Sequence, residues 1–271
     1  MTTKIAQRVA TSAWLIVLAG CITACQGTPF RGTTSTLVDL THPFDTETIY
    51  WPTEDGFKLY VEAAGLTDAG YYYSANRFAG AEHGGTHLDA PIHFAEGHWT
   101  VDQIPLEQLI GPAIKVDVRA QCDADRNYQI QVADFEAWES EHGRIEPGSI
   151  VLLHTGFARH WPNRALYLGT ETVGSEAVAE LSFPGLHPDA ALWLAGERGI
   201  HAIGLDTASI DHGQSTLFES HRILFAANVP VFENLTQLVK LPPRGFDVFA
   251  LPMKIGGGTG APLRAIAVLP N

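Results

Sequence analysis

Cysteine is scarce in this chain of 271 residues, and three copies leave no room for a disulfide scaffold. Cys21 and Cys25 lie near the N-terminus, and Cys122 is the only cysteine in the rest of the sequence. Cys122 stands in the polar stretch Ala-Gln-Cys-Asp-Ala-Asp-Arg-Asn, which favours a solvated loop position over a catalytic thiol. The sequence therefore predicts chemistry carried by other side chains.

Basic residues are also few. The chain has 17 Lys and Arg against 30 Asp and Glu, which gives a formal net charge of −13. No segment gathers Lys and Arg into the stripe that phosphate neutralisation requires. The composition therefore argues against a nucleic-acid partner, and the acidity mainly favours solubility.

A long apolar run is absent as well. The apolar segment Ala13–Ala19 is too short to span a bilayer comfortably, and it follows the positive residues Lys4 and Arg8. Small residues and the two N-terminal cysteines come next, which predicts a lipoprotein-type signal over residues 1–24, with the lipid on Cys21 or Cys25. A simple cleavable signal or a signal anchor stays open. The predicted protein is exported, either periplasmic or anchored to a membrane by its lipid.

The remaining sequence predicts one domain. Residues 25–36 have the composition of a flexible tether, and no repeat or further linker interrupts residues 37–271. Short runs rich in β-branched residues predict these strands: Thr36–Leu40, Ala113–Val118, Ile150–Leu153, Ala202–Leu205, Val229–Phe232 and Ala265–Leu269. Helices are expected over Val132–His142, Pro188–Arg198 and His221–Ala227, and the second has Pro at its first position and Gly199 after its end. Alternating strands and helices predict an α/β fold, and many Gly- and Pro-rich turns favour a curved, barrel-like sheet.

What the sequence does contain is a dense group of metal-ligand types, His83-Gly-Gly-Thr-His87-Leu-Asp89-Ala-Pro-Ile-His93. Two glycines and a proline disfavour a helix here, so we expect an extended segment entered through a Gly-Gly turn. In a strand, His87 and Asp89 point to the same side, and the turn lets His83 fold back over them. Nitrogen and oxygen ligands suit Zn, Mn or Fe(II), and three protein ligands leave room for water. A lone histidine would be read as an ordinary core residue, but this density predicts a divalent-metal site.

Other polar residues carry weaker signals. His93 can be a further ligand, a general base or a residue that orients a ligand. His98 fits a solvated turn or the rim of a pocket. His221 and Glu233, twelve residues apart, are commonplace taken alone, and turn chemistry explains Asp206, Ser209 and Asp211 almost as well as a role in orienting ligands. The glycine-rich run 256–262 lacks the Lys-Ser/Thr ending of a phosphate-binding loop, so it predicts a close backbone approach instead.

The segment 83–93 resembles the His-x-Gly-Thr-His-x-Asp-x-Pro-x-His motif of the metal-dependent cyclase-like hydrolases, which include bacterial kynurenine formamidase and isatin hydrolase. The resemblance covers nearly all of residues 37–270. Further matching segments follow in the expected order: Asp39–Pro43, Gly111–Asp117, Leu152–Phe157, Phe183–Leu186, Gly204–Asp211 and His221–Glu233.

This resemblance implies a swivelling β/β/α fold with a curved, barrel-like mixed sheet flanked by helices. It implies that His83, His87 and Asp89 hold a first metal, and that His221 and Glu233 join the same aspartate around a second. One or two ions of Mn(II) or Zn(II) are expected. The resemblance assigns acid/base work to His93 and implies a homo-oligomer, a dimer or tetramer.

The expected reaction is hydrolysis of an amide C–N bond that is not a peptide bond. Water activated by the metal attacks the carbonyl, and His93 carries its proton to the leaving nitrogen. A cyclic amide opened as by an isatin hydrolase is the first expectation, and an aryl formamide such as N-formylkynurenine is the alternative. Trp51 and Phe94 are candidates for stacking on an aromatic substrate, although core packing explains them, and Trp99, equally well. A non-catalytic exported protein that binds a metal or ligand is the alternative of another class.

Overall fold

The computed structural model describes residues 35–270 of the chain. The predicted signal, residues 1–24, lies outside the described residues, as do residues 25–34 of the predicted tether. Among the described residues, none of the helices combines the length and the apolar character needed to cross a membrane.

Twelve strands are present in the described part of the chain. They are β1 (Thr36–Asp39), β2 (Lys58–Leu66), β3 (Tyr72–Ala79), β4 (His87–Asp89), β5 (Ile110–Asp117), β6 (Gln129–Ile130), β7 (Ile150–His154), β8 (Gly185–Leu186), β9 (Ala202–Leu205), β10 (Val231–Glu233), β11 (Arg244–Pro252) and β12 (Gly260–Leu269). The α-helices are α1 (Leu106–Leu109), α2 (Arg119–Ala124), α3 (Val132–His142), α4 (Arg164–Leu168), α5 (Pro188–Trp193) and α6 (Glu219–Ala226). A π-helical turn, Leu194–Arg198, prolongs α5, and short 3-10 helices span Pro91–His93, Val101–Gln103, Phe157–His160, Ser175–Glu180 and Leu238–Lys240.

The main sheet closes on itself. Its strand order is β1-β12-β11-β5-β7-β9-β10-β4, and β4 also pairs with β12, so the seven strands from β12 to β4 form a ring. Neighbours from β5 through β7 and β9 to β10 run parallel, whereas the pairs that involve β11, β12 and β4 with their other neighbours are antiparallel. The expected barrel-like mixed sheet is therefore confirmed.

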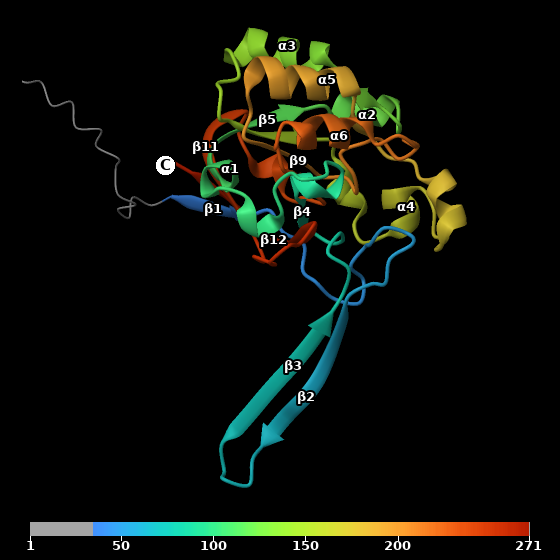
Figure 1. Ribbon diagram of the computed structural model, residues 1–271, viewed down its shortest axis with the longest axis vertical. Helices are drawn as coiled ribbons and strands as arrows, with labels where there is room; N and C mark the ends of the chain where they lie inside the picture. The colour runs from blue at the N-terminus through green and yellow to red at the C-terminus, as the bar shows by residue number, and fades with distance from the viewer. Residues whose placement is uncertain (1–34, 271) are drawn as a thin grey trace, which may run out of the picture. The chain divides into compact units, whose positions relative to one another are not determined.

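Strand β7 shows how the buried residues of the sheet form the centre of the fold. All five of its residues are buried, as expected for a parallel strand covered on both faces. Val151 and Leu153 pack in the core under the helices, whereas Ile150 and Leu152 belong to the second core, which contains residues from β9, β11 and β12. Helices α3, α5 and α6 lie together over one side of the sheet (Figure 1).

The two helices with the clearest sequence limits form as expected. α3 spans Val132–His142, the predicted range, and Phe135 and Trp138 on it are buried. α5 begins at Pro188, and its π-helical continuation ends at Arg198 before Gly199, whose φ of 59° is the left-handed conformation that glycine favours.

The prediction for Cys122 was wrong. The residue lies in α2, only 3% of its surface is exposed, and it belongs to the core under the helices. The polar neighbours that suggested a loop are the solvent-facing residues of a short helix. Burial raises the pKa of the thiol, which disfavours the thiolate that a nucleophile requires.

Strands β2, β3, β6, β8 and β11 were not predicted. β2 and β3 form a hairpin that pairs with no other strand among the described residues and extends away from the barrel (Figure 1). Its residues are almost all exposed, so no buried alternation marks them in the sequence.

A buried histidine in the loop after β1 predicts a pH-dependent stability. His42 stacks on Trp161 with ring centroids 4.3 Å apart, its Nε2 has no hydrogen-bond partner, and burial lowers its pKa to about 4. The unfolded chain takes up a proton below about pH 6.5, whereas folded His42 stays neutral until about pH 4. His42 should therefore reduce stability by on the order of 3 kcal/mol as pH falls through this window.

Urea titrations at pH 7 and pH 4.5 test this prediction. The free energy of unfolding of His42→Phe, which keeps a ring beside Trp161, should fall less between the two values than that of the wild type. Equal losses in both proteins would show that His42 does not titrate in this way.

Candidate metal centre

Strand β4 places the candidate ligands because it has neighbours on both edges. His87 lies opposite Glu233 of β10 and opposite Pro262 of β12, and Asp89 lies opposite Gly260. The register thus brings Glu233 to the motif at residues 83–93. The extended segment predicted for His87–Asp89 is present.

The Gly-Gly turn before β4 has a steric cause. A Cβ on Gly84 would lie 2.1 Å from the ring of Tyr50, and Gly85 has a φ of +57°. The backbone can make this turn only with glycine at the first position, and it favours glycine at the second. The turn carries His83 back towards Asp89, as the sequence predicted.

Asp89 is the centre of the cluster. Its Oδ1 lies 2.6 Å from Nδ1 of His83 and 3.0 Å from Nε2 of His87, and its Oδ2 lies 3.1 Å from Nε2 of His221. Glu233 lies 3.6 Å from Nε2 of His87 and 3.4 Å from Nε2 of His221. Ligands that share a tetrahedral ion at the usual bond lengths are separated by about 3.3 Å, so most of these distances match a common cation. The structure therefore brings together all five residues proposed as ligands.

Two of the histidines are held in one orientation from behind. Nδ1 of His87 lies 3.0 Å from the carbonyl oxygen of Gly85, and Nδ1 of His221 lies 2.6 Å from Oδ2 of Asp211. In both rings this leaves Nε2 directed at the carboxylates, the arrangement that metal-binding histidines usually show. Asp211 is thus a residue that orients a candidate ligand, one of the two roles that the sequence left open for it.

The third histidine is oriented by residues that sequence reasoning missed. Nε2 of His83 lies 2.9 Å from the hydroxyl of Thr259, which donates a 2.6 Å hydrogen bond to Glu82. Glu82 also accepts hydrogen bonds from the backbone N–H groups of Thr259 and Gly260. A Cβ on Gly260 would lie 2.5 Å from the His83 ring, so the glycine-rich run does approach the site closely. The position of Glu82 next to His83 was the one sequence signal available.

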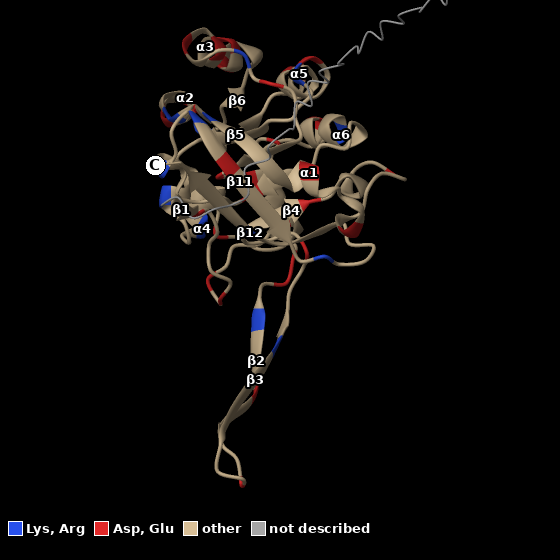
Figure 2. Cartoon of the chain, turned by 90° about the vertical axis from the view of Figure 1, so that its left-hand side faces the viewer, with Lys and Arg blue, Asp and Glu red and all other residues tan. Residues whose placement is uncertain are grey.

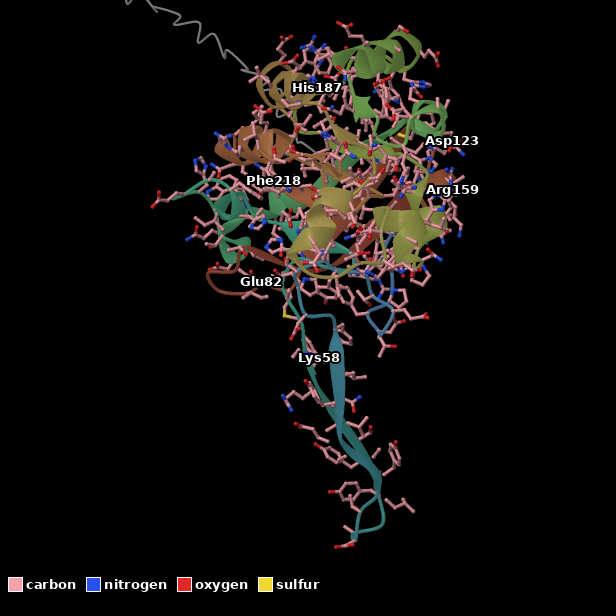
Figure 3. The ribbon with its side chains drawn as sticks, turned by 90° about the vertical axis from the view of Figure 1, so that its right-hand side faces the viewer. Lys58, Glu82, Asp123, Arg159, His187 and Phe218 are labelled. Atoms are coloured by element: carbon pink, nitrogen blue, oxygen red, sulfur yellow. The ribbon has the colours of Figure 1, made fainter. Side chains whose placement is uncertain are left out.

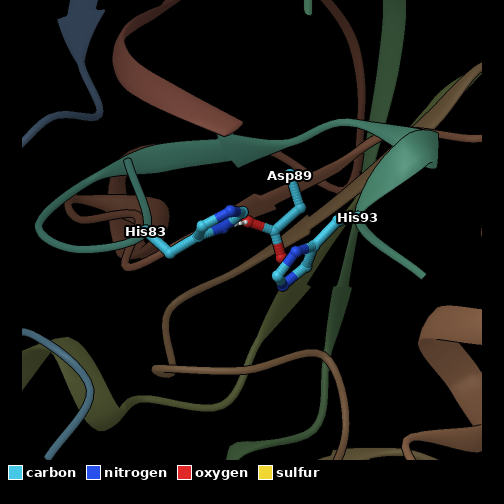
Figure 4. A group of neighbouring side chains, drawn as sticks. All are labelled: His83, Asp89 and His93. Carbon is cyan, nitrogen blue, oxygen red and sulfur yellow. Dashed lines mark hydrogen bonds and ion pairs between the residues drawn. The ribbon is translucent and has the colours of Figure 1, made fainter. Parts of the chain in front are cut away.

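His93 lies beside the cluster rather than apart from it. Its ring stacks on His83 with centroids 3.9 Å apart, and Figure 4 shows His93 and His83 on either side of the Asp89 carboxylate. Donor atoms of His83, Asp89 and His93 lie within 4.8 Å of one another, and so do those of His87, Asp89 and Glu233. Both groups contain Asp89, but they divide the ligands differently from the two sites that the resemblance implied.

The charges of the site fit a divalent cation. Asp89 and Glu233 are buried, and neither Lys nor Arg lines the pocket around them. Burial and the neighbouring Asp89 raise the pKa of Glu233. Burial alone would lower the pKa of His87, but Asp89 and Glu233 outweigh it and raise that pKa to about 9. The two carboxylates therefore favour protonated, positively charged imidazoles when no ion is bound. A divalent ion bound to the same atoms would supply the positive charge in place of those protons.

The cluster forms the floor of a pocket of about 370 Å³. The two proposed substrate-binding residues, Trp51 and Phe94, line it, and so do Phe218, Glu54 and Ser209. Trp99 does not line it and packs against the barrel core instead. His98 faces Asn228, with its Nδ1 3.1 Å from the amide oxygen.

Asp206 fixes a turn of the backbone, unlike Asp211. Its carboxylate accepts hydrogen bonds from the backbone N–H groups of Thr155 and Gly156, at 2.7 and 2.9 Å. It thus fixes the turn after β7, and it is not among the residues that line the pocket.

Comparison with known proteins places this site in a family. The Cyclase family (Putative cyclase) matches residues 38–212. The chain belongs to the Cyclase family. Isatin hydrolase of Roseibium aggregatum is 31% identical over 210 residues, which cover 74% of this chain and 77% of that protein. Kynurenine formamidase of Salinibacter ruber is 28% identical over 184 residues, which cover 68% and 74%. The structure of isatin hydrolase A from Ralstonia solanacearum matches with a TM-score of 0.78 and 32% identity, over 87% of this chain and 92% of that one.

These relatives confirm the resemblance that the segment 83–93 predicted, and they confirm the fold. They also confirm the predicted class, a metal-dependent hydrolase of C–N bonds outside peptides.

Within this Cyclase-family centre, the Thr259 hydroxyl has a testable effect. Thr259→Val keeps the side-chain shape but removes the group that joins His83 to Glu82. Metal affinity should fall about 10- to 100-fold, as is usual when the partner of a ligand is lost. Competition with a chelator measures it. Thr172→Val is the matched control, because Thr172 bonds to Glu180 in the same way at an exposed position. Equal affinities in the three proteins would contradict the role.

Proposed function

We propose that this chain opens a small aromatic cyclic amide of the isatin type by hydrolysis. The observation that carries the proposal is the Asp89-centred cluster at the floor of a pocket with aromatic walls and neither Lys nor Arg in its lining. Isatin is flat and uncharged, so it suits such a pocket, whereas an amino-acid substrate would bring a carboxylate with no Lys or Arg to receive it.

One or two ions of Mn(II) or Zn(II) are the proposed cofactor, held by His83, His87, Asp89, His221 and Glu233. A bound divalent ion supplies Lewis acidity, which polarises the carbonyl and makes water more acidic. The nitrogen and oxygen donors fit both metals.

The protein's own residues have separate tasks in this proposal. Trp51 and Phe94 flank the aromatic ring of the substrate, and burial of that ring contributes binding energy. His93 accepts the proton of the attacking water at a ring nitrogen and returns it to the leaving amide nitrogen. His93 lies 4.5 Å from Phe94 between ring centroids, so the proposed base and the proposed binding surface adjoin.

Hydrolysis of an aryl formamide is the second candidate. Glu54 favours it, because this carboxylate at the pocket wall offers a partner for the ammonium group of N-formylkynurenine. The two substrates differ in charge, so they give different expectations for Glu54→Gln. The KM for isatin should change little, whereas the KM for N-formylkynurenine should rise.

Turnover of a substrate panel tests the function. Protein reconstituted with Mn(II) or Zn(II) is assayed with isatin, N-formylkynurenine and simple lactones. Ring opening of isatin with the highest kcat/KM supports the proposal. A higher kcat/KM with N-formylkynurenine supports the aryl formamidase function instead. Bound metal without turnover of any amide, lactam or lactone would instead support a non-catalytic binding protein.

We further propose that the protein is exported and carries a lipid at Cys21 or Cys25. The support is the order of positive residues, short apolar segment and small residues before each cysteine. Mass spectrometry of the N-terminal peptide after expression of Cys21→Ser and Cys25→Ser should find the lipid lost in one variant and kept in the other. An unmodified, uncleaved N-terminus in the wild type would contradict the proposal.

A further inference from the structure

The turn after β9, residues 206–211, carries a hydroxyl that the tasks assigned above leave unused. Ser209 lines the pocket, and only 4% of its surface is exposed. Its backbone oxygen accepts a 3.1 Å hydrogen bond from the Thr207 hydroxyl, but its own hydroxyl bonds to no residue that the structure describes. Buried polar groups are nearly always hydrogen-bonded, so this exception points to a partner that comes from outside the chain.

The Ser209 hydroxyl is open to the pocket. Its oxygen is not among the side-chain atoms that are fully buried without a hydrogen-bond partner, so solvent reaches it. Because nearly all of Ser209 is buried, the accessible part of the hydroxyl faces the cavity that the residue lines. A molecule bound in that cavity can therefore accept a hydrogen bond from it.

The residues that follow Ser209 fix its position relative to the candidate metal ligands. Ile210 donates its backbone N–H to Oε1 of Glu233 at 2.7 Å. Asp211 then bonds through Oδ2 to Nδ1 of His221 at 2.6 Å. Two candidate ligands are thus tied to the two residues after Ser209, so the hydroxyl has a defined place beside the metal centre.

The rest of the pocket offers a flat substrate aromatic rings and acceptors. Figure 3 labels two of its lining residues, Phe218 and Glu82, on the same side of the barrel. Phe218 packs on Phe94 with ring centroids 5.1 Å apart, so this wall is apolar. Strand β4 carries an acid, Asp89, and no base (Figure 2). A carbonyl oxygen of the substrate therefore meets few donors other than Ser209.

We propose that Ser209 donates a hydrogen bond to a second carbonyl group next to the scissile amide carbonyl, and so selects cyclic amides with two adjacent carbonyls. This inference rests on the proposed function and names the substrate class within it. When water opens the ring, its oxygen adds to the amide carbon, the C–N bond breaks and a proton passes to nitrogen. The neighbouring ketone stays intact, so it can accept the hydrogen bond from substrate binding to product release.

A donor at the ketone favours both binding and rate. The ketone oxygen loses its water when the substrate enters the pocket, and a polar atom left without a partner there would weaken binding. A hydrogen bond to the ketone also withdraws electrons from the adjacent amide carbon, which makes that carbon easier for water to attack. Simple lactams, aryl formamides and lactones lack the second carbonyl, so they gain neither effect.

Tyr50 is the competing donor. It also lines the pocket, and its hydroxyl bonds to no residue in the described part of the chain. That hydroxyl lies beside Gly80, where an added Cβ would be 2.9 Å from it, at the root of the β2–β3 hairpin. Ser209, in contrast, precedes the residue that is bonded to Glu233. The position beside the metal centre therefore favours Ser209.

Ser209→Ala and Ser149→Ala form a matched pair of variants. Ser149 is also 4% exposed, but its hydroxyl donates to the Glu146 carbonyl oxygen at 2.7 Å, and it does not line the pocket. Full-length, metal-loaded proteins are assayed with isatin and with the lactone of o-hydroxyphenylacetic acid, which has similar fused rings without the ketone. Ser209→Ala should lower kcat/KM for isatin about 10-fold and change that for the lactone less than about twofold. Ser149→Ala should change neither.

Binding and stability separate contact with the substrate from a structural effect. In calorimetry, the Kd of the product, o-aminophenyloxoacetate, should rise about 10-fold in Ser209→Ala. The Kd of o-aminophenylacetate, which lacks the ketone, should not change. The melting temperature of Ser209→Ala should match the wild type, because no hydrogen bond within the chain is lost, whereas that of Ser149→Ala should fall.

The possible failures of the inference and of the proposed function are distinct. An equal loss with both substrates, or an unchanged preference in Ser209→Ala, would overturn the inference while isatin turnover by the wild type upholds the function. A selective loss in Tyr50→Phe but not in Ser209→Ala would assign the ketone to Tyr50 and overturn it as well. Metal-loaded wild-type protein that does not open isatin would contradict the proposed function, and the inference with it.

Discussion

Asp89→Asn is expected to lose its metal and, with it, nearly all hydrolytic activity. The side chain keeps its shape, but it loses the negative charge that three imidazoles and any bound cation share. Among the described residues, both groups of donor atoms that could hold an ion contain Asp89, so its replacement removes a ligand from each of them. We expect less than about a tenth of the wild-type metal content after dialysis, because removing a charged ligand typically costs several kcal/mol. Elemental analysis and isatin turnover measure the two effects.

Glu54→Gln is the control for that change. Glu54 lines the same pocket, but it belongs to neither group of donor atoms. Removal of the Glu54 charge should leave the metal content unchanged. Asp89→Asn protein that retains a full complement of metal would show that the ion is held elsewhere.

The local part of the site could be predicted because it lies within eleven residues. A Gly-Gly turn followed by a short strand is enough to bring His83, His87 and Asp89 together, and both features can be recognised from residue types. The structure has this arrangement.

Glu233 and His221 could not be predicted from local spacing. Glu233 meets His87 through the pairing of β10 with β4, and residue spacing alone does not reveal which strands become neighbours in a closed sheet. The resemblance to a known family nominated both residues. Thr259 and Glu82 had no such support, because their contact spans 177 positions along the chain.

The β2–β3 hairpin and Cys122 were missed for opposite reasons. The hairpin buries almost nothing in its own chain, and its bulge breaks the two-residue period by which a strand is recognised. Cys122 is buried although its neighbours are polar, because a helix of six residues can bury one side and expose the rest. For Cys122 the deciding contacts come from residues distant in the sequence, whereas the hairpin has almost no buried contacts for a sequence pattern to reflect.

The position of His93 differs from what the family resemblance implied, and experiment can test the difference. The resemblance places His93 outside the ligand set, whereas the structure puts its ring nitrogen within reach of Asp89 and His83. His93 can therefore act as a ligand or as a proton carrier, and these roles predict different consequences of its removal.

His93→Ala is expected to reduce kcat about 10²- to 10⁴-fold while metal content stays at the wild-type level. Five other donors remain in the cluster, so the ion has enough ligands without His93. In contrast, the substitution removes the imidazole that would accept the proton of the attacking water and pass it to the leaving nitrogen. Turnover of isatin and elemental analysis are measured on the same sample.

His98→Ala is the matched control for this prediction. It removes a histidine five residues further along the same segment, whose ring faces Asn228, and it should leave kcat unchanged. Loss of metal from His93→Ala would make His93 a ligand. Full activity would remove it from the reaction altogether. Retained metal with a large fall in kcat is the combination that only a proton carrier gives, because a ligand would change both quantities and a structural residue would lower the melting temperature as well.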